Sequence, residues 1–112
     1  MANYPETIYY GKQPIRTITM NGVTKFVARD ICGILGYPRA DKMLNPFVAT
    51  APEYISFKTT GGTQSVRVVE REDLEIVLAH SRHENAPRLL AWLRRHTEPT
   101  ARGFVAIGVI FD

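Results

Sequence analysis

Residues 14–44 read PIRTITMNGVTKFVARDICGILGYPRADKML, and this stretch decides the fold. It contains two segments typical of β-strands, Ile15–Met20 and Val23–Val27. The dipeptide Asn21-Gly22 between them is the strongest short signal for a β-hairpin. The sequence therefore predicts a pair of antiparallel strands near the start of the domain.

The register of this hairpin follows from the distribution of its apolar side chains. A two-residue turn would mix apolar and polar side chains on each face. One extra residue at a glycine bulge instead pairs Ile18 with Phe26 and Met20 with Thr24, which keeps the apolar side chains together. We therefore expect the bulged form.

Two short helices are expected after the hairpin. Apolar residues recur at helical spacing over Ala28–Leu35, and Gly36 suits the left-handed residue that ends a helix. Pro38 prevents the helix from continuing. A second helix is expected over about Arg39–Asn45, ending before Pro46.

A second hairpin is predicted over Tyr54–Thr59 and Gln64–Val69, around Gly61-Gly62. A two-residue turn there puts the apolar side chains on one face, pairing Phe57 with Val66 and Ile55 with Val68. The polar side chains that then share the other face are Ser56, Lys58, Ser65 and Arg67.

Two more helices are expected over Glu72–His80 and Ala86–Arg95, the second with Asn85 as its N-cap. The predicted fold class is α+β, with two β-hairpins each followed by a pair of short helices (β-β-α-α-β-β-α-α). A small antiparallel sheet would pack on the helices. The apolar tail, residues 104–112, is expected to be covered, because an unpaired apolar strand promotes aggregation.

The composition fits one globular domain over residues 1–112, with a core at about 14–103. The chain is 45% hydrophobic and 22% charged. No apolar run is long enough to span a membrane, and residues 1–10 do not resemble a signal peptide. The single Cys32 excludes an internal disulfide and fits a reducing compartment. We therefore expect a cytoplasmic protein.

The net charge of +3 is unevenly distributed. Residues 11–48 hold six basic and two acidic side chains, residues 49–80 three and five, and residues 81–112 five and three. Two basic regions thus flank an acidic one. This charge permits a nucleic-acid partner but does not require one.

Signs of catalysis or metal binding are weak. The chain has no G-x-S-x-G, Walker or G-x-G-x-x-G motif. Cys32 lies on an amphipathic helix without a catalytic signature, which favours a buried core residue. His80 and His83 could turn toward one metal ion, but a structural zinc site needs about four ligands and only His96 and remote carboxylates remain. We expect no enzyme activity, metal or cofactor.

Three clusters of side chains are candidates for binding. The second hairpin, a ribbon that would fit the major groove of DNA, carries the first cluster, Lys58, Gln64 and Arg67. The corner between the first two helices carries the second cluster, Arg29, Arg39 and Lys42. The last helix carries the third cluster, whose side chains could stack on bases or contact a protein, namely Arg88, Trp92 and Arg95. The plainer interpretations are a solvated sheet face for the hairpin, and a core Trp92 covered by arginines for the helix.

Three segments carry a resemblance to a known family, namely Pro14–Leu44, Thr59–Ser81 and Ala86–Arg102. Their motifs include Ala28-Arg29-Asp30-Ile31-Cys32, Leu35-Gly36-Tyr37, Gly62 with Gln64, Ser81 and Trp92. In order and spacing they resemble the Bro-N domain, the N-terminal domain of the BRO family. That family includes phage antirepressors and baculovirus repeated-ORF proteins.

The resemblance implies a DNA-binding module that regulates transcription of phage or prophage genes, associated with the nucleoid of a bacterial host. It supplies no catalytic residues. A second domain usually follows in phage proteins, so we expect a stand-alone member or a fragment. The alternative is a protein-interaction module that inactivates a phage repressor by direct contact without binding DNA, through the cluster on the last helix. A homodimer is compatible with either function.

Overall fold

The computed structural model describes the backbone of residues 4–48 and 51–107, and the side chains of all of these except residues 4, 5 and 57–59. Within these residues the fold is α+β, as predicted. No helix in the described ranges is long and apolar enough to cross a bilayer.

The order of elements is richer than the predicted β-β-α-α-β-β-α-α. The helices are α1 (Ala28–Leu35), α2 (Ala40–Leu44), α3 (Arg71–His80) and α4 (Ala86–His96). The strands are β1 (Tyr4–Tyr10), β2 (Gln13–Met20), β3 (Val23–Val27), β4 (Glu53–Thr59), β5 (Gly62–Val69), β6 (Thr97–Thr100) and β7 (Gly103–Ala106). The predicted order omitted β1, β6 and β7, so it is wrong in detail.

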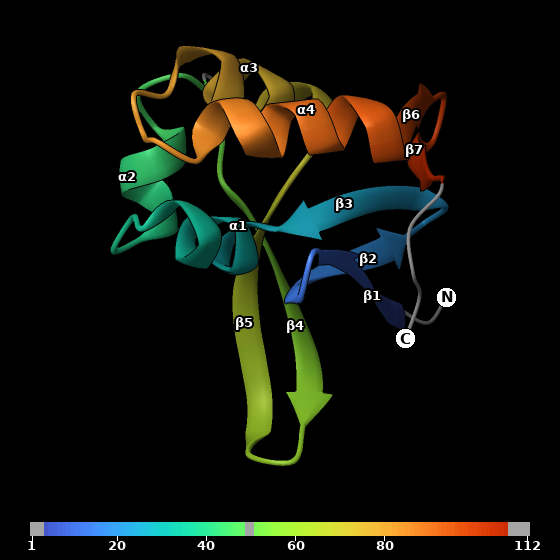
Figure 1. Cartoon of the computed structure of the whole chain (residues 1–112). Helices are drawn as coiled ribbons and strands as arrows, with labels where there is room; N and C mark the ends of the chain where they lie inside the picture. Colours follow the sequence, from blue (N-terminus) through green and yellow to red (C-terminus); the bar gives the residue numbers. More distant parts are fainter. Residues whose placement is uncertain (1–3, 49–50, 108–112) are drawn as a thin grey trace.

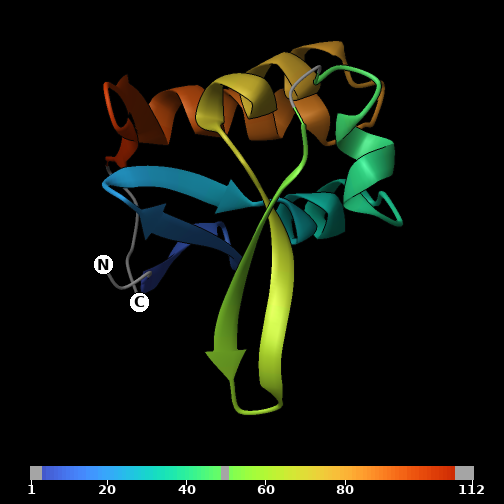
Figure 2. The same cartoon turned by 180° about the vertical axis from the view of Figure 1, so that it is seen from behind.

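Five strands form one antiparallel sheet in the order β1-β2-β3-β5-β4, and β6 and β7 form a separate two-stranded sheet. The two parts of the larger sheet meet over a short distance, because β3 pairs with β5 only through Phe26↔Val69 and Val27↔Val68. The β4–β5 hairpin, residues 53–69, therefore extends away from the body as an arm (Figures 1 and 2). Helices α3 and α4 lie on the opposite side of the molecule from the arm.

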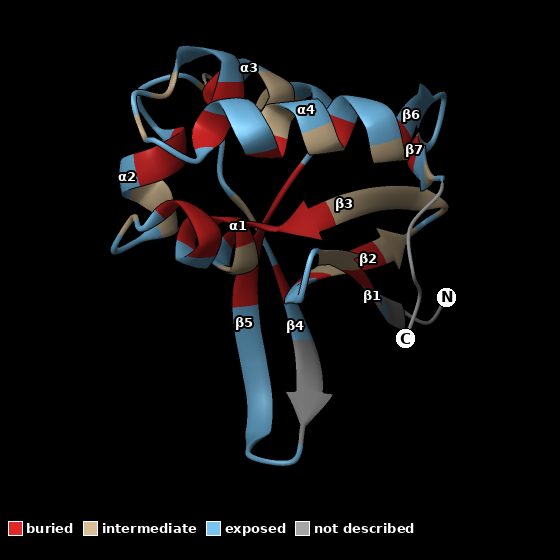
Figure 3. Ribbon diagram, viewed as in Figure 1, coloured by how far each residue is buried: buried red, intermediate tan, exposed pale blue. Residues whose placement is uncertain are grey.

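The sheet is buried on both faces near the base of the arm. The larger core cluster joins β1–β3 to the helices and includes Phe26, Ile31 and Leu93. A second cluster lies where the arm joins β2 and β3, and consists of Ile18, Val27, Ile55, Val66 and Val68. Burial ends along the arm, where residues 60–65 are exposed (Figure 3).

The predicted bulge in the first hairpin is wrong. Asn21 and Gly22 form a two-residue turn, both with positive φ (54° and 80°), and Ile18 pairs with Lys25. The prediction assumed one solvated face. Because each face carries its own core cluster, both faces accept apolar side chains, and Lys25 is accommodated by ion pairs with Glu53 and Glu70.

The second hairpin has the predicted faces but not the predicted pairs. Ile55 lies opposite Val66 rather than Val68, and Phe57 opposite Gln64. The turn falls at Thr60-Gly61, because Gly62 already belongs to β5 and adopts the left-handed φ of 111° there. A shift of two residues preserves alternation, so Ser56, Lys58, Ser65 and Arg67 still share one face.

The helices agree best with the sequence. Helix α1 has the predicted bounds, and Gly36 ends it at φ 91° with its N–H donating to the Cys32 carbonyl at 2.8 Å. Asn85 occupies the N-cap position of α4, as predicted, but its side chain does not cap the helix. Its backbone is already helical, and its side-chain amide instead donates to the Ile34 carbonyl at 3.3 Å, tying α4 to α1.

The C-terminal hairpin, β6–β7, packs against the β2–β3 hairpin. Phe104 is buried and stacks on Phe26 with ring centroids 4.3 Å apart, and the Thr24 N–H donates to the Arg102 carbonyl at 3.0 Å. The start of the tail is thus covered as expected, although Val105 and Ile107 are exposed. Residues 108–112 lie outside the described residues.

Candidate nucleic-acid interface

A groove of about 510 Å³ lies between the arm and the corner where α1 meets α2. The arm lines it with Tyr54, Ser65 and Arg67, and the helical corner lines it with Arg29, Gly33 and Arg39. Tyr54 and Arg67 are direct cross-strand neighbours, so their side chains lie on the same face of the arm. The groove therefore brings one residue of the predicted hairpin cluster to two residues of the predicted corner cluster.

The other predicted DNA contacts lie elsewhere. Lys42 is exposed on α2 but is not among the described residues that line the groove. Gln64 is exposed, and its register places it on the arm face opposite that of Arg67. Lys58 shares the face of Arg67 by register, and its side chain lies outside the described side chains.

Arg67 is buried rather than solvated, with 7% of its surface exposed. Its Nη1 donates to the Asn45 side-chain oxygen at 3.0 Å, because the end of α2 folds over the base of β5. Among the described residues no carboxylate forms an ion pair with Arg67. A buried charge is ordinarily paired with a charge of opposite sign. The guanidinium of Arg67 is therefore unusual in being buried without a counter-ion among the described residues.

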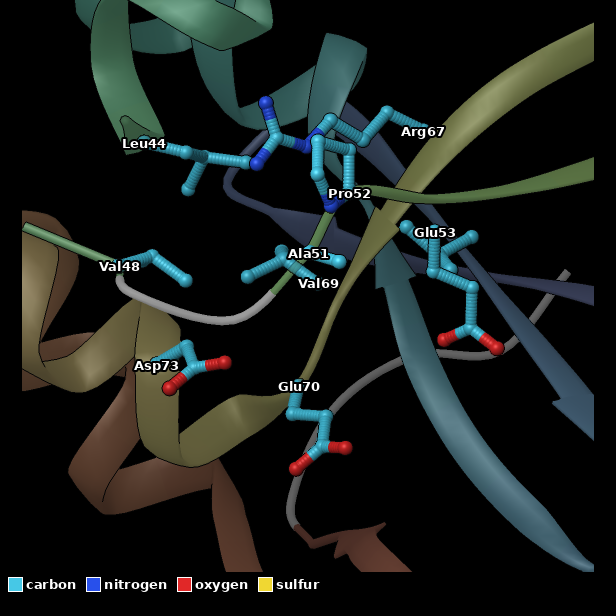
Figure 4. Close-up of a pocket in the computed structure, with 10 residues that line it drawn as sticks. Leu44, Val48, Ala51, Pro52, Glu53, Arg67, Val69, Glu70 and Asp73 are labelled. Carbon is cyan, nitrogen blue, oxygen red and sulfur yellow. The ribbon is translucent and has the colours of Figure 1, made fainter.

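Carboxylates also lie near Arg67, at the base of the arm. A small cavity of about 90 Å³ there is lined by Arg67, Glu53, Glu70 and Asp73, among others. Figure 4 shows Arg67 reaching from β5 toward Leu44 of α2, away from Glu70. Glu53 and Glu70 instead form ion pairs with Lys25. Carboxylates thus line a cavity beside Arg67, but among the described residues none of them forms an ion pair with it.

The two arginines of the helical corner are accessible. Arg29 is exposed and has no ion-pair partner among the residues described here. Arg39 contacts Asp41 at 3.2 Å, with 64% of its side chain exposed. An exposed pair of this kind contributes about 0–1 kcal/mol, so Arg39 can exchange its partner for another anion at little cost.

The third cluster does not join the groove. Arg88 and Arg95 are exposed on α4, on the far side of the molecule from the arm (Figure 2). Trp92 is half-buried and packs edge-on against Tyr10, with ring centroids 5.9 Å apart. Its indole thus belongs mainly to the edge of the core.

Cys32 borders the groove but is poorly suited to act as a nucleophile. It is buried, and its thiol lies 3.7 Å from the Met43 sulfur. Burial raises the pKa of Cys32 to about 11, so it is protonated at neutral pH.

Each of the three histidines contacts a different aromatic ring. His80 stacks on Phe47, whereas His83 and His96 contact Tyr37 and Trp92 with tilted rings. Over the described residues, no three His, Cys, Asp or Glu side chains group together in a way that could hold a metal ion.

Sequence reasoning missed Tyr54, Asn45 and Gly33 as parts of this site. Tyr54 is 61% exposed, and its alternation with Ile55 already placed it on the polar face of the arm. No local signal marks Asn45 or Gly33, because the contact of α2 with β5 and the groove beside α1 arise only in the folded chain.

The fold and the site define a small α+β domain in which a projecting β-arm stands beside an arginine-lined groove. Residues 14–99 match the model of the N-terminal domain of the BRO family, Bro-N. The chain therefore belongs to the BRO family, and the domain is a regulatory domain of the BRO type found in phage and baculovirus proteins. The searches of curated proteins and of solved structures returned no match.

Proposed function

We propose that this domain is a DNA-binding regulator of the phage antirepressor type, which acts by binding and not by catalysis. The observation that supports this is the buried Arg67, which has no carboxylate partner among the described residues and lies in a groove with two accessible arginines. A phosphate oxygen is the ligand that such a site favours, because guanidinium groups bind phosphate through paired, charge-assisted hydrogen bonds.

The arm supports the same function by its shape. A two-stranded ribbon fits the major groove of DNA, and residues 60–65 at its outer end are exposed and mostly small or polar. Contacts of the groove with the phosphate backbone would set the position of the arm, and the arm would read base edges. The BRO family includes phage antirepressors, which supports a role in relieving repression.

The test is a fluorescence anisotropy titration of labelled duplex DNA over a range of salt concentrations. The double variant Arg29→Ala/Arg39→Ala should bind more weakly. Its plot of log affinity against log salt should flatten by about 2, because each lost phosphate contact removes about 0.9 from the slope.

The matched control is Arg88→Ala/Arg95→Ala, which removes the same charge from exposed positions on α4. It should leave the salt slope unchanged. Equal losses in both double variants would show that only net charge matters and would exclude the groove as the interface. Absence of binding to duplex at low salt would overturn the proposal in favour of a protein partner, for which the surface of Arg88, Trp92 and Arg95 is the candidate.

A further inference from the structure

The feature that the fold does not explain is a glycine inside a helix. Gly33 is the sixth residue of α1, with ordinary helical backbone geometry, and it is exposed in the wall of the groove. A Cβ added there would meet nothing within 4 Å. Glycine in a helix interior is less stable than alanine, so neither packing nor conformation favours it at this position.

Two other glycines, Gly36 and Gly103, have an evident structural reason. Gly36 ends α1 in a left-handed conformation, and Gly103 combines positive φ with contact to the backbone of Thr24. Gly33 has neither reason. The space that its missing side chain leaves opens into the groove.

That space is bordered by positive charge. Arg29 precedes Gly33 by four residues and so lies on the same side of α1, one turn away. Arg67 lines the same groove from the arm, and among the described residues its one hydrogen-bonding partner through its side chain is Asn45. A guanidinium carries five N–H donors, which leaves donors for a further acceptor.

We propose that Gly33 keeps open a seat in which a DNA phosphodiester lies directly against α1, with Arg67 and Arg29 as its cationic partners. A side chain at this position would hold the ligand backbone away from the helix and from the buried guanidinium. The seat rests on the proposed DNA-binding function and deepens it, because it assigns the closest phosphate contact to Arg67 rather than to the exposed arginines alone.

The test measures thermal unfolding and duplex binding on the same variants, Gly33→Ala and Gly33→Gln. Both should raise the unfolding midpoint, because alanine and glutamine favour the helix. Both should weaken binding, by about tenfold for alanine if one charge-assisted contact is lost, and by more for the longer glutamine. Ala91→Gln on α4 is the matched control, since it adds similar bulk to an exposed helical position away from the groove and should leave affinity unchanged.

A Gly33→Gln variant that is more stable and still binds with unchanged affinity would overturn the seat. The result for Arg29→Ala/Arg39→Ala separates the two proposals. If that variant loses affinity while Gly33→Gln does not, the groove binds DNA but no phosphodiester lies against α1 at Gly33. If neither loses affinity, the proposed DNA-binding function of the groove fails as well.

Discussion

Replacing Gly103 with alanine should destabilise the domain strongly, because two separate effects act at this residue. Gly103 has a φ of 97°, in the left-handed region, where a residue with a Cβ is disfavoured by about 1–2 kcal/mol. The added Cβ would also lie 2.4 Å from the Thr24 carbonyl oxygen and 3.0 Å from the Thr24 nitrogen. These are backbone atoms of β3, so the clash is relieved only if β7 moves away from β3.

That movement weakens two interactions of the C-terminal hairpin. The hydrogen bond from the Thr24 N–H to the Arg102 carbonyl is worth about 1 kcal/mol. The stacking of Phe104 on Phe26 is worth about 0.5–1.5 kcal/mol beyond its burial. We therefore expect Gly103→Ala to lower the free energy of unfolding by about 3–4 kcal/mol. At about 4 °C per kcal/mol, the thermal midpoint should fall by about 12 °C or more.

Urea and thermal unfolding, followed by circular dichroism, would measure the effect. Gly11→Ala is the control, since Gly11 also has positive φ, 62°, but a Cβ there meets nothing within 4 Å. It should lose only the conformational part, about 1–2 kcal/mol. If the two variants lose the same stability, the contact of β7 with β3 does not contribute to folding, and the reasoning is refuted.

Two further predictions concern the body of the domain. Cys32 in the native protein should react with a thiol reagent far more slowly than in the unfolded chain. Burial raises the pKa of Cys32 from 9.0 to about 11, so the contribution of this shift to the free energy of unfolding should be complete below pH 9.0 and decline as pH rises toward about 11. Unfolding measured over this pH range should show the decline, and Cys32→Ala should abolish it. Asp30→Ala should lower unfolding free energy by about 2 kcal/mol, because Asp30 accepts hydrogen bonds from the Arg16 backbone and guanidinium at 2.8–3.0 Å; an unchanged urea midpoint would show that this link between β2 and α1 is dispensable.

The parts of the fold that the sequence predicted are those in which local signals suffice. Helix α1 was predicted to the residue, since apolar spacing and the left-handed Gly36 both depend on neighbouring residues alone. Strand β1 was missed because, among its described side chains (residues 6–10), Ile8 alone is fully buried, and a single buried residue gives no alternation to recognise. The register of the first hairpin failed because a second core, supplied by the arm, covers the face that was assumed to be solvated.

For the candidate site, the sequence predicted some of the residues but not how they are arranged in space. Alternation correctly placed Arg67 on the polar face of the hairpin, but its burial depends on Asn45, which is 22 residues earlier in the chain. The convergence of Arg67 with Arg29 and Arg39 likewise needs the packing of α1 and α2 beside the arm. Tertiary contacts of this kind cannot be inferred from the spacing of residues in the sequence.

The narrow attachment of the arm has a consequence for how such domains diversify. Only two residue pairs join β5 to β3, and residues 60–65 at the outer end are exposed and contribute nothing to either core cluster. Substitutions there change unfolding free energy little, as is general for surface positions, except at Gly62, whose φ of 111° disfavours any residue with a Cβ. The tip can therefore acquire new sequences, and with them new preferences for a partner, while selection for a folded body continues to act on a separate set of residues.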